Sequence, residues 1–200
     1  SIHTWLWNPF QKIAGQAALV LGVILVLLTS WIGSLSSTHF DGVLDTHFGA
    51  AVPLWFFLAE GMINWLSMAI MLWVVALVIG KAGKFRLIDL FGTQALARWP
   101  FMVTALAALT PGYRRAAIEL EKIDPNTMAI PPVEPADAVA FGVIAIVMLV
   151  MLVWFCWLAW KSFRVSCDAK GKSAIGGFFV ALIVAEIISK VAITALTKLL

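Results

Sequence analysis

Residues 136–160 read ADAVAFGVIAIVMLVMLVWFCWLAW, and Asp137 is the only charged side chain in this stretch. An α-helix needs about 20 apolar residues to cross the roughly 30 Å hydrocarbon core of a bilayer. The apolar residues do not alternate with a period of two, so the stretch differs from the strands of a membrane β-barrel. It therefore predicts a transmembrane helix.

Four further apolar runs are long enough to cross a membrane. They cover residues of about 13–35, 52–79, 86–109 and 174–197. Hydrophobic residues make up 62% of the 200-residue chain and charged residues 12%, against roughly 45–50% and about 25% in soluble domains. These proportions exclude an ordinary soluble enzyme and a disordered chain. We expect an all-α integral membrane bundle of five transmembrane helices, in which 1–200 form one domain.

Basic residues are distributed unevenly between the runs. Segments 80–86 and 161–173 hold seven Lys or Arg residues, whereas 36–51 holds none and 110–135 holds three, offset by four acidic residues. Cytoplasmic loops of membrane proteins are enriched in Lys and Arg, so we expect the N-terminus in the cytoplasm and the C-terminus outside. The net charge of +3 includes no basic stripe that would indicate nucleic-acid binding.

Prolines and aromatic residues mark the borders of the helices. Pro100 lies inside the third run and should kink it or end a regular turn there. In the connector 110–135 we expect a short amphipathic helix over Tyr113–Ile123 and then an extended, proline-rich stretch. The aromatic start Thr4–Lys12 fits an interfacial element or a tail packed on the bundle. It shows no cleavable signal, so we expect the first run to act as its own targeting signal.

Two histidines and two aspartates gather before the second run. His39, Asp41, Asp45 and His47 follow the pattern H-x-D-x3-D-x-H, and imidazole and carboxylate groups bind zinc and other first-row divalent ions. At 100° per residue the four would point in different directions from a straight helix. They can converge only from a bent loop, which Gly42 permits. The alternative is a polar hairpin that caps the outer end of the bundle.

Polar side chains within the runs form a second group. Three pairs spaced by four residues lie on the second, third and fifth runs. They are Glu60 and Asn64, Gln94 and Arg98, and Glu186 and Lys190. A charge at mid-membrane costs about 2.5–3.5 kcal/mol on insertion scales, so these residues should face the interior and pair. Because they should lie at similar depths in the membrane, we expect Arg98 to form an ion pair with Glu186, and Lys190 to form one with Glu60 or Glu186. The network either fixes helix packing or forms a proton or ion pathway.

Three short motifs stand at the borders of the runs. Residues 8–13 read NPFQKI, 80–86 read GKAGKFR with Gly92 and Pro100 following, and 160–164 read WKSFR. In this layout the chain resembles the Yip family, the Ypt/Rab-interacting multispanning membrane proteins, in its bacterial branch. The resemblance implies five transmembrane helices in a bacterial inner membrane.

The resemblance has a limit in the third run, where Thr93 and Gln94 stand in place of the tyrosines usual after the glycine. The long cytosolic tail through which eukaryotic members are expected to reach trafficking partners is not among these residues. Rab binding is therefore not implied.

Three functions stay open on the sequence alone. The resemblance itself implies no settled function for bacterial members. The first hypothesis is a non-enzymatic membrane scaffold or adaptor of the Yip type, which lies in the lipid bilayer and associates as a homo-oligomer. The charges of Glu60, Arg98, Glu186 and Lys190 would suit a small transporter or channel. The loop His39–His47 would suit a metal-dependent membrane enzyme with a divalent ion such as zinc. The sequence shows no nucleophile-elbow or phosphate-loop motif and indicates no other cofactor.

Overall fold

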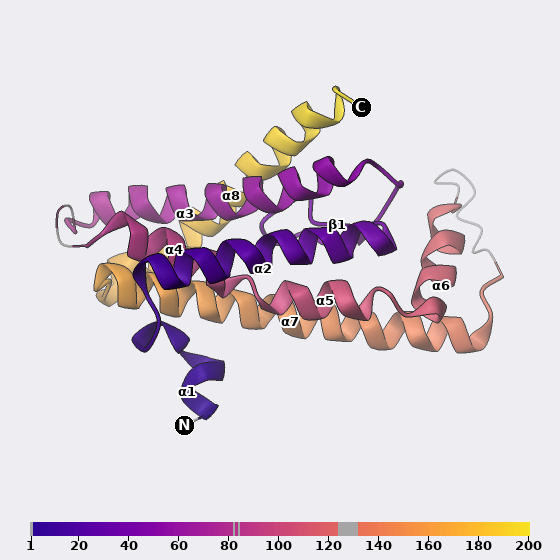
Figure 1. Ribbon diagram of the computed structural model, residues 1–200, viewed down its shortest axis with the longest axis horizontal. Helices are drawn as coiled ribbons and strands as arrows, with labels where there is room; N and C mark the ends of the chain where they lie inside the picture. The colour runs from indigo at the N-terminus through magenta and orange to yellow at the C-terminus, as the bar shows by residue number, and fades with distance from the viewer. Residues whose placement is uncertain (1, 82, 84, 124–131) are drawn as a thin grey trace.

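The computed structural model describes residues 2–81, 83, 85–123 and 132–200 (Figure 1). Within these residues, four helices are long and apolar enough to cross a membrane. They are α2 (Gly15–Ser36), α3 (Leu54–Val78), α7 (Pro135–Cys167) and α8 (Gly171–Thr197). The expectation of an all-α helical bundle is therefore confirmed, with four candidate membrane spans.

The third apolar run is not one continuous helix, so five uninterrupted spans are not confirmed. It contains α4 (Leu87–Ala97) and α5 (Pro100–Ala107), with two residues between them. The backbone amides of residues 98, 99, 101 and 102 donate to carbonyls three residues back rather than four. Pro100 supplies no N–H, so it interrupts the helical hydrogen bonds at the position where the sequence predicts a kink.

Helices α2 and α4 pack closely because glycines replace side chains at their contact. A Cβ atom on Gly22 would lie 2.5 Å from the amide nitrogen of Leu96, and one on Gly92 would lie 2.7 Å from that of Leu19. Small residues allow membrane helices to approach this closely. Helix α7 also packs on α4 and α5, while α8 packs on α3 and diverges from α7 toward the C-terminus (Figure 1).

The largest core cluster joins α3, α5, α7 and α8. Its fully or almost fully buried side chains include Leu72, Phe101, Phe155 and Phe163.

Helix α7 has an exposed apolar face along much of its length. The exposed residues of this face include Val139, Val143, Ile146, Leu149 and Val153. Such a continuous apolar face fits contact with lipid chains rather than with water.

Short helices lie at the periphery of the bundle. Helix α1 (Ile2–Trp7) and the 3₁₀ helix η1 (Pro9–Gln11) precede α2, and α6 (Pro111–Glu121) follows α5. The short helix expected over Tyr113–Ile123 is confirmed, although it begins two residues earlier because proline is favoured in a first helical turn. Positions 124–131 of the expected extended stretch lie outside the described residues.

The connector of residues 37–53, which we call the re-entrant loop, folds back into the bundle. Its strands β1 (Thr38–His39) and β2 (His47–Phe48) form one short antiparallel pair. Between them, Phe40 and Val43 are 3% and 0% exposed and join the main core cluster. Non-helical backbone buried inside a membrane protein is tolerated where other protein groups satisfy its N–H and C=O groups. The side chains that bind this loop are therefore central to the fold.

Candidate functional site

Helix α3 binds the first part of the re-entrant loop through two buried polar side chains. Oε1 of Glu60 lies 2.8 Å from Nδ1 of His39, and Oε2 accepts a hydrogen bond of 3.4 Å from the amide of Phe40. One turn further along α3, Asn64 Nδ2 donates a short hydrogen bond to the carbonyl oxygen of Phe40. Glu60 and Asn64 thus supply the partners that this backbone would otherwise find in a helix or sheet.

Helix α8 binds the second part of the loop in the same manner. Glu186 Oε2 accepts a hydrogen bond of 2.7 Å from the amide of Leu44, and Ser189 Oγ accepts one of 3.2 Å from the amide of Val43. Gly42 leaves the space that the Glu186 carboxylate occupies, because a Cβ atom at this position would collide with it. Side chains of both α3 and α8 therefore hold the loop.

Lys190 completes the contacts of α8. Its Nζ lies 2.6 Å from Oδ2 of Asp45 and 3.5 Å from Oε1 of Glu186. The expected pairing of Lys190 with Glu186 is confirmed, while Asp45 is a second partner that the sequence argument did not include. Glu60 is instead the partner of His39. The ammonium group balances carboxylates of both the helix and the loop.

His39 and Glu60 share a buried proton. The carbonyl oxygen of Ala50 lies 2.8 Å from His39 Nε2 and can only accept, so Nε2 carries a hydrogen. The contact between Nδ1 and Glu60 then needs one further proton, on the imidazole or on the carboxyl group. Burial alone would lower the pKa of His39, but the hydrogen bond and the negative charge of Glu60 outweigh it and raise this pKa. The proton is therefore held more tightly on His39 than on an imidazole in water.

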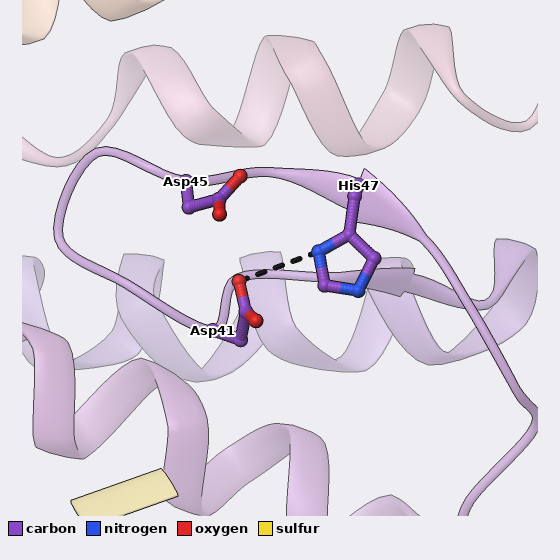
Figure 2. A group of neighbouring side chains, drawn as sticks. All are labelled: Asp41, Asp45 and His47. Atoms are coloured by element: carbon purple, nitrogen blue, oxygen red, sulfur yellow. Dashed lines mark ion pairs between the residues drawn. The ribbon is translucent and has the colours of Figure 1, made fainter. Parts of the chain in front are cut away.

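His47 and Asp41 form a second, more exposed pair (Figure 2). His47 Nδ1 lies 3.3 Å from Asp41 Oδ1. This contact raises the pKa of His47 against the effect of burial and lowers the pKa of Asp41. The rings of His39 and His47 stack with their centroids 5.7 Å apart. Two histidine–carboxylate pairs thus stand next to each other at one end of the bundle.

The two pairs line a cleft of about 220 Å³ between the re-entrant loop, the start of α3 and the last turns of α8. His39, Asp41, His47 and Glu60 line it from the loop and α3. It is also lined by three residues of α8 and by the last residue of the chain, namely Ile193, Thr194, Thr197 and Leu200. A cleft lined by two adjacent imidazoles can exchange protons with solvent or offer ligands to a cation.

Three of the four predicted metal ligands come together. Asp41, Asp45 and His47 each offer one ligand atom, and these atoms lie within 4.8 Å of one another (Figure 2). The prediction is wrong for His39, because both of its ring nitrogens already bind protein groups. A cation at this position would have to compete with the Lys190 ammonium for Asp45 and with the proton of His47 for its ring nitrogen.

Arg98 does not pair with Glu186, contrary to expectation. Its guanidinium carbon lies 4.7 Å from the ring centroid of Phe101 and 5.2 Å from that of Phe155. Nη1 is buried and has no hydrogen-bond partner among the described residues. Glu186 still acts on Arg98 through its charge, but its oxygens bind Leu44 and Lys190 instead. An internal cavity of about 10 Å³ adjoins Arg98.

Gln94 belongs to a separate cluster that joins α4 to α7. Its Nε2 donates hydrogen bonds of 2.9 Å to the carbonyl of Ala159 and to Oγ of Ser162. Ser162 also lies 2.7 Å from Oγ1 of Thr93, which lies 2.8 Å from Oγ of Ser166. The sequence argument missed these hydroxyl groups. Their signal was the four-residue spacing of Ser162 and Ser166, which places both on one face of α7.

No family model matches the chain, and no curated protein or solved structure matches it. Membership of the Yip family therefore stays a prediction based on the motifs at 8–13, 80–86 and 160–164. The function has to be inferred from the geometry of the bundle and its cleft.

Proposed function

We propose that the chain is a non-enzymatic scaffold protein of the Yip type, whose internal polar residues hold its re-entrant loop in place. The observation that carries this proposal is the use of the predicted intramembrane network. Glu60 and Asn64 bind the loop from α3, and Glu186 and Lys190 bind it from α8. Gln94 binds α7. These residues hold the helices and the loop together, as expected if the polar network fixes helix packing rather than forming an ion pathway.

A transport pathway has less support from the same residues. Arg98 is the one member of the predicted network whose side chain forms no ion pair or hydrogen bond with the described residues. The cavity beside it, about 10 Å³, holds on the order of one water molecule. A small transporter needs a site near mid-membrane that opens to either side, and a cavity of this size does not provide one.

Reconstitution into liposomes distinguishes the two functions. The full chain is incorporated into vesicles that contain a pH-sensitive dye, and a potassium diffusion potential is applied. A scaffold should give proton flux no faster than protein-free vesicles. A flux that Glu60→Gln or Arg98→Leu abolishes would overturn the scaffold proposal in favour of transport, since both substitutions remove a charge from the predicted network.

A second candidate function is binding of a divalent cation, and the proximity of Asp41, Asp45 and His47 supports it. A metal-dependent membrane enzyme would use such an ion. Metal content of the purified protein, measured after incubation with zinc, tests this. Asp45→Asn and His47→Ala should each lower the bound zinc, while Lys190→Met should raise its affinity by removing a competing cation. Equal zinc in all variants would exclude this site.

We further propose that the protein lies in a bacterial inner membrane with its N-terminus in the cytoplasm. In this proposal α4 and α5 together make a fifth, broken crossing. We also propose that the chain forms homo-oligomers. The uneven distribution of basic residues supports the orientation. Single cysteines at Lys81 and Glu119, in a background lacking Cys156 and Cys167, test the crossing. Labelling of both cysteines from the same side of the membrane would exclude a crossing by α4 and α5. Light scattering in detergent measures how many copies of the chain associate.

A further inference from the structure

A polar groove runs between the N-terminal segment and the C-terminal part of α7, far from the re-entrant loop. It consists of two adjoining hollows of about 360 and 390 Å³. Asn8, Gln11 and Lys161 line both hollows. Trp7 and Trp157 line the first, and Arg164 lines the second. None of these residues takes part in the contacts that hold the re-entrant loop.

The wall of the groove is fixed by indole side chains of α7. Trp154 Nε1 donates to the carbonyl oxygen of Leu6, and Trp157 Nε1 donates to that of Trp7, each over 3.2 Å. The ring of Trp7 contacts both indoles. Trp7 and Trp157 remain 47% and 41% exposed. Half-exposed indoles held by hydrogen bonds are typical of the level at which lipid headgroups meet the hydrocarbon core.

The length of α7 places the groove at this level. Its 33 residues correspond to about 50 Å of helix, whereas about 20 residues cross the hydrocarbon core. The apolar stretch of α7 ends at Trp160, and Lys161 and Arg164 follow directly. These two cations therefore stand where the helix leaves the hydrocarbon region.

The charge of the groove is not balanced by the protein. Lys170 is paired with Asp168 at 2.6 Å. Lys161 and Arg164 have no carboxylate partner in the part of the chain that the structure describes, and instead lie over aromatic rings, Lys161 at 4.4 Å from Trp157. The groove thus offers two positive charges that no carboxylate of the described residues neutralises through an ion pair.

We infer that this groove binds the headgroup of an anionic phospholipid. The phosphate lies between Lys161 and Arg164. The acyl chains pass Trp7 and Trp157 toward the apolar face of α7. Basic pockets at the cytoplasmic side of membrane proteins bind acidic lipids in this manner. The inference rests on the membrane-embedded fold and not on the proposed scaffold function.

Native mass spectrometry of the full chain, titrated with phosphatidylglycerol or phosphatidylcholine, tests the inference. The protein should bind phosphatidylglycerol more tightly than phosphatidylcholine. The combined change Lys161→Gln and Arg164→Gln should weaken this binding about 10- to 30-fold, because each cation near a headgroup contributes several-fold. The matched control, Arg114→Gln with Lys122→Gln, removes the same charge from α6 and its end, and should leave binding unchanged. Equal binding of the two lipids, or equal loss in both double variants, would overturn the inference.

Two further measurements identify the ligand and guard against misfolding. Phosphatidic acid, which is also anionic, should bind in preference to phosphatidylcholine, and circular dichroism should show unchanged helix content in every variant. If the double charge variant loses helix content, Lys161→Gln and Arg164→Gln are tested singly, and each should weaken phosphatidylglycerol binding several-fold. A large excess of inorganic phosphate should not displace the lipid. Displacement by free phosphate, or unchanged binding in both single variants, would contradict a lipid site.

Discussion

Glu60 and Arg98 are both charged residues buried inside one bundle, but their surroundings differ. Glu60 contacts the imidazole of His39 and the amide of Phe40. Arg98 lies against two phenylalanine rings, and its Nη1 has no partner among the described residues. A buried charge stabilises a fold through the polar groups that it satisfies. The re-entrant loop needs such groups because most of its backbone is not in a helix, whereas the backbone around Arg98 is largely satisfied by helical bonds.

The largest effect should follow from Glu60→Leu. This change leaves His39 Nδ1 and the Phe40 amide without a partner in a buried site, which should cost about 3–5 kcal/mol of unfolding free energy. Reversible unfolding in mixed detergent micelles, followed by circular dichroism, measures it. Glu119→Leu, which removes an exposed ion pair with Lys122, is the control and should change stability by about 0.5 kcal/mol or less. Equal effects of the two changes would refute the anchoring role of Glu60.

Gly42→Ala should have the next largest effect. The added methyl group would collide with the carboxylate at the flexible end of the Glu186 side chain and displace it from the Leu44 amide, and losing this hydrogen bond to a charged group should cost about 1–3 kcal/mol. Gly142→Ala is the matched control, because a Cβ atom there meets open space. That variant should be unchanged or slightly more stable. A tolerated Gly42→Ala would mean that the loop is not tightly held on this side.

Arg98→Met tests the other side of the comparison. The variant loses the contacts of the guanidinium with Phe101 and Phe155, but it also removes the cost of burying a charge without a direct counterion. The two effects oppose each other, so the same unfolding assay should show a loss of no more than about 1 kcal/mol. A double-mutant cycle with Glu186→Leu should be nearly additive. Strong coupling in that cycle would indicate a direct pair of Arg98 with Glu186.

The pH dependence should be the smallest effect. The pKa values of His39 and His47 are raised in the folded protein. Their stabilisation is therefore fully present below about pH 6.5, the ordinary value, and is lost as the pH rises through the raised values. Asp41, with its lowered pKa, acts oppositely and loses its contribution as the pH falls below about 4. Unfolding midpoints at mildly acidic and mildly alkaline pH measure the change.

His47→Gln provides the matched variant for this pH experiment. It should remove part of the pH dependence and leave the part that belongs to the buried His39. The change is small because His47 and Asp41 are partly exposed, and solvent weakens their interaction. A pH dependence that is unchanged in His47→Gln would contradict the proposed role of this pair.

Several features of the fold were predictable because they depend on local sequence. The apolar run at 136–160 lies within α7, and Pro100 marks the break between α4 and α5. The short helix in the connector after α5 was also expected. The clustering of Asp41, Asp45 and His47 followed from their closeness in the chain. In each case the physical cause acts within a few residues: the length of an apolar run, a missing N–H, or a short bent loop.

Other features of the site depend on contacts between distant segments. His39 is close to Asp41 in sequence, but Glu60 and Ala50 occupy its two ring nitrogens. Glu186 and Arg98 were expected at similar depths, but depth along a helix does not specify the direction in which a side chain points. Leu44 lies 142 residues from Glu186 in the chain, and yet its amide donates a hydrogen bond to the Glu186 carboxylate. Such competition between partners is decided only when all helices are assembled.

The sequence by itself determined that this protein is a helical membrane bundle, because apolar residues in runs of more than about 20 leave the chain no other way to satisfy its backbone in lipid. It also indicated four polar residues that are buried, Glu60, Asn64, Gln94 and Arg98, but the expectation that Lys190 faces the interior was wrong, because its side chain is 45% exposed. The tertiary structure alone decided their partners. It brought the re-entrant loop between α3 and α8, where its unsatisfied amides and His39 bind the carboxylates of Glu60 and Glu186. Arg98 forms no direct ion pair with the described residues, because the carboxylate expected for it binds the backbone of this loop instead.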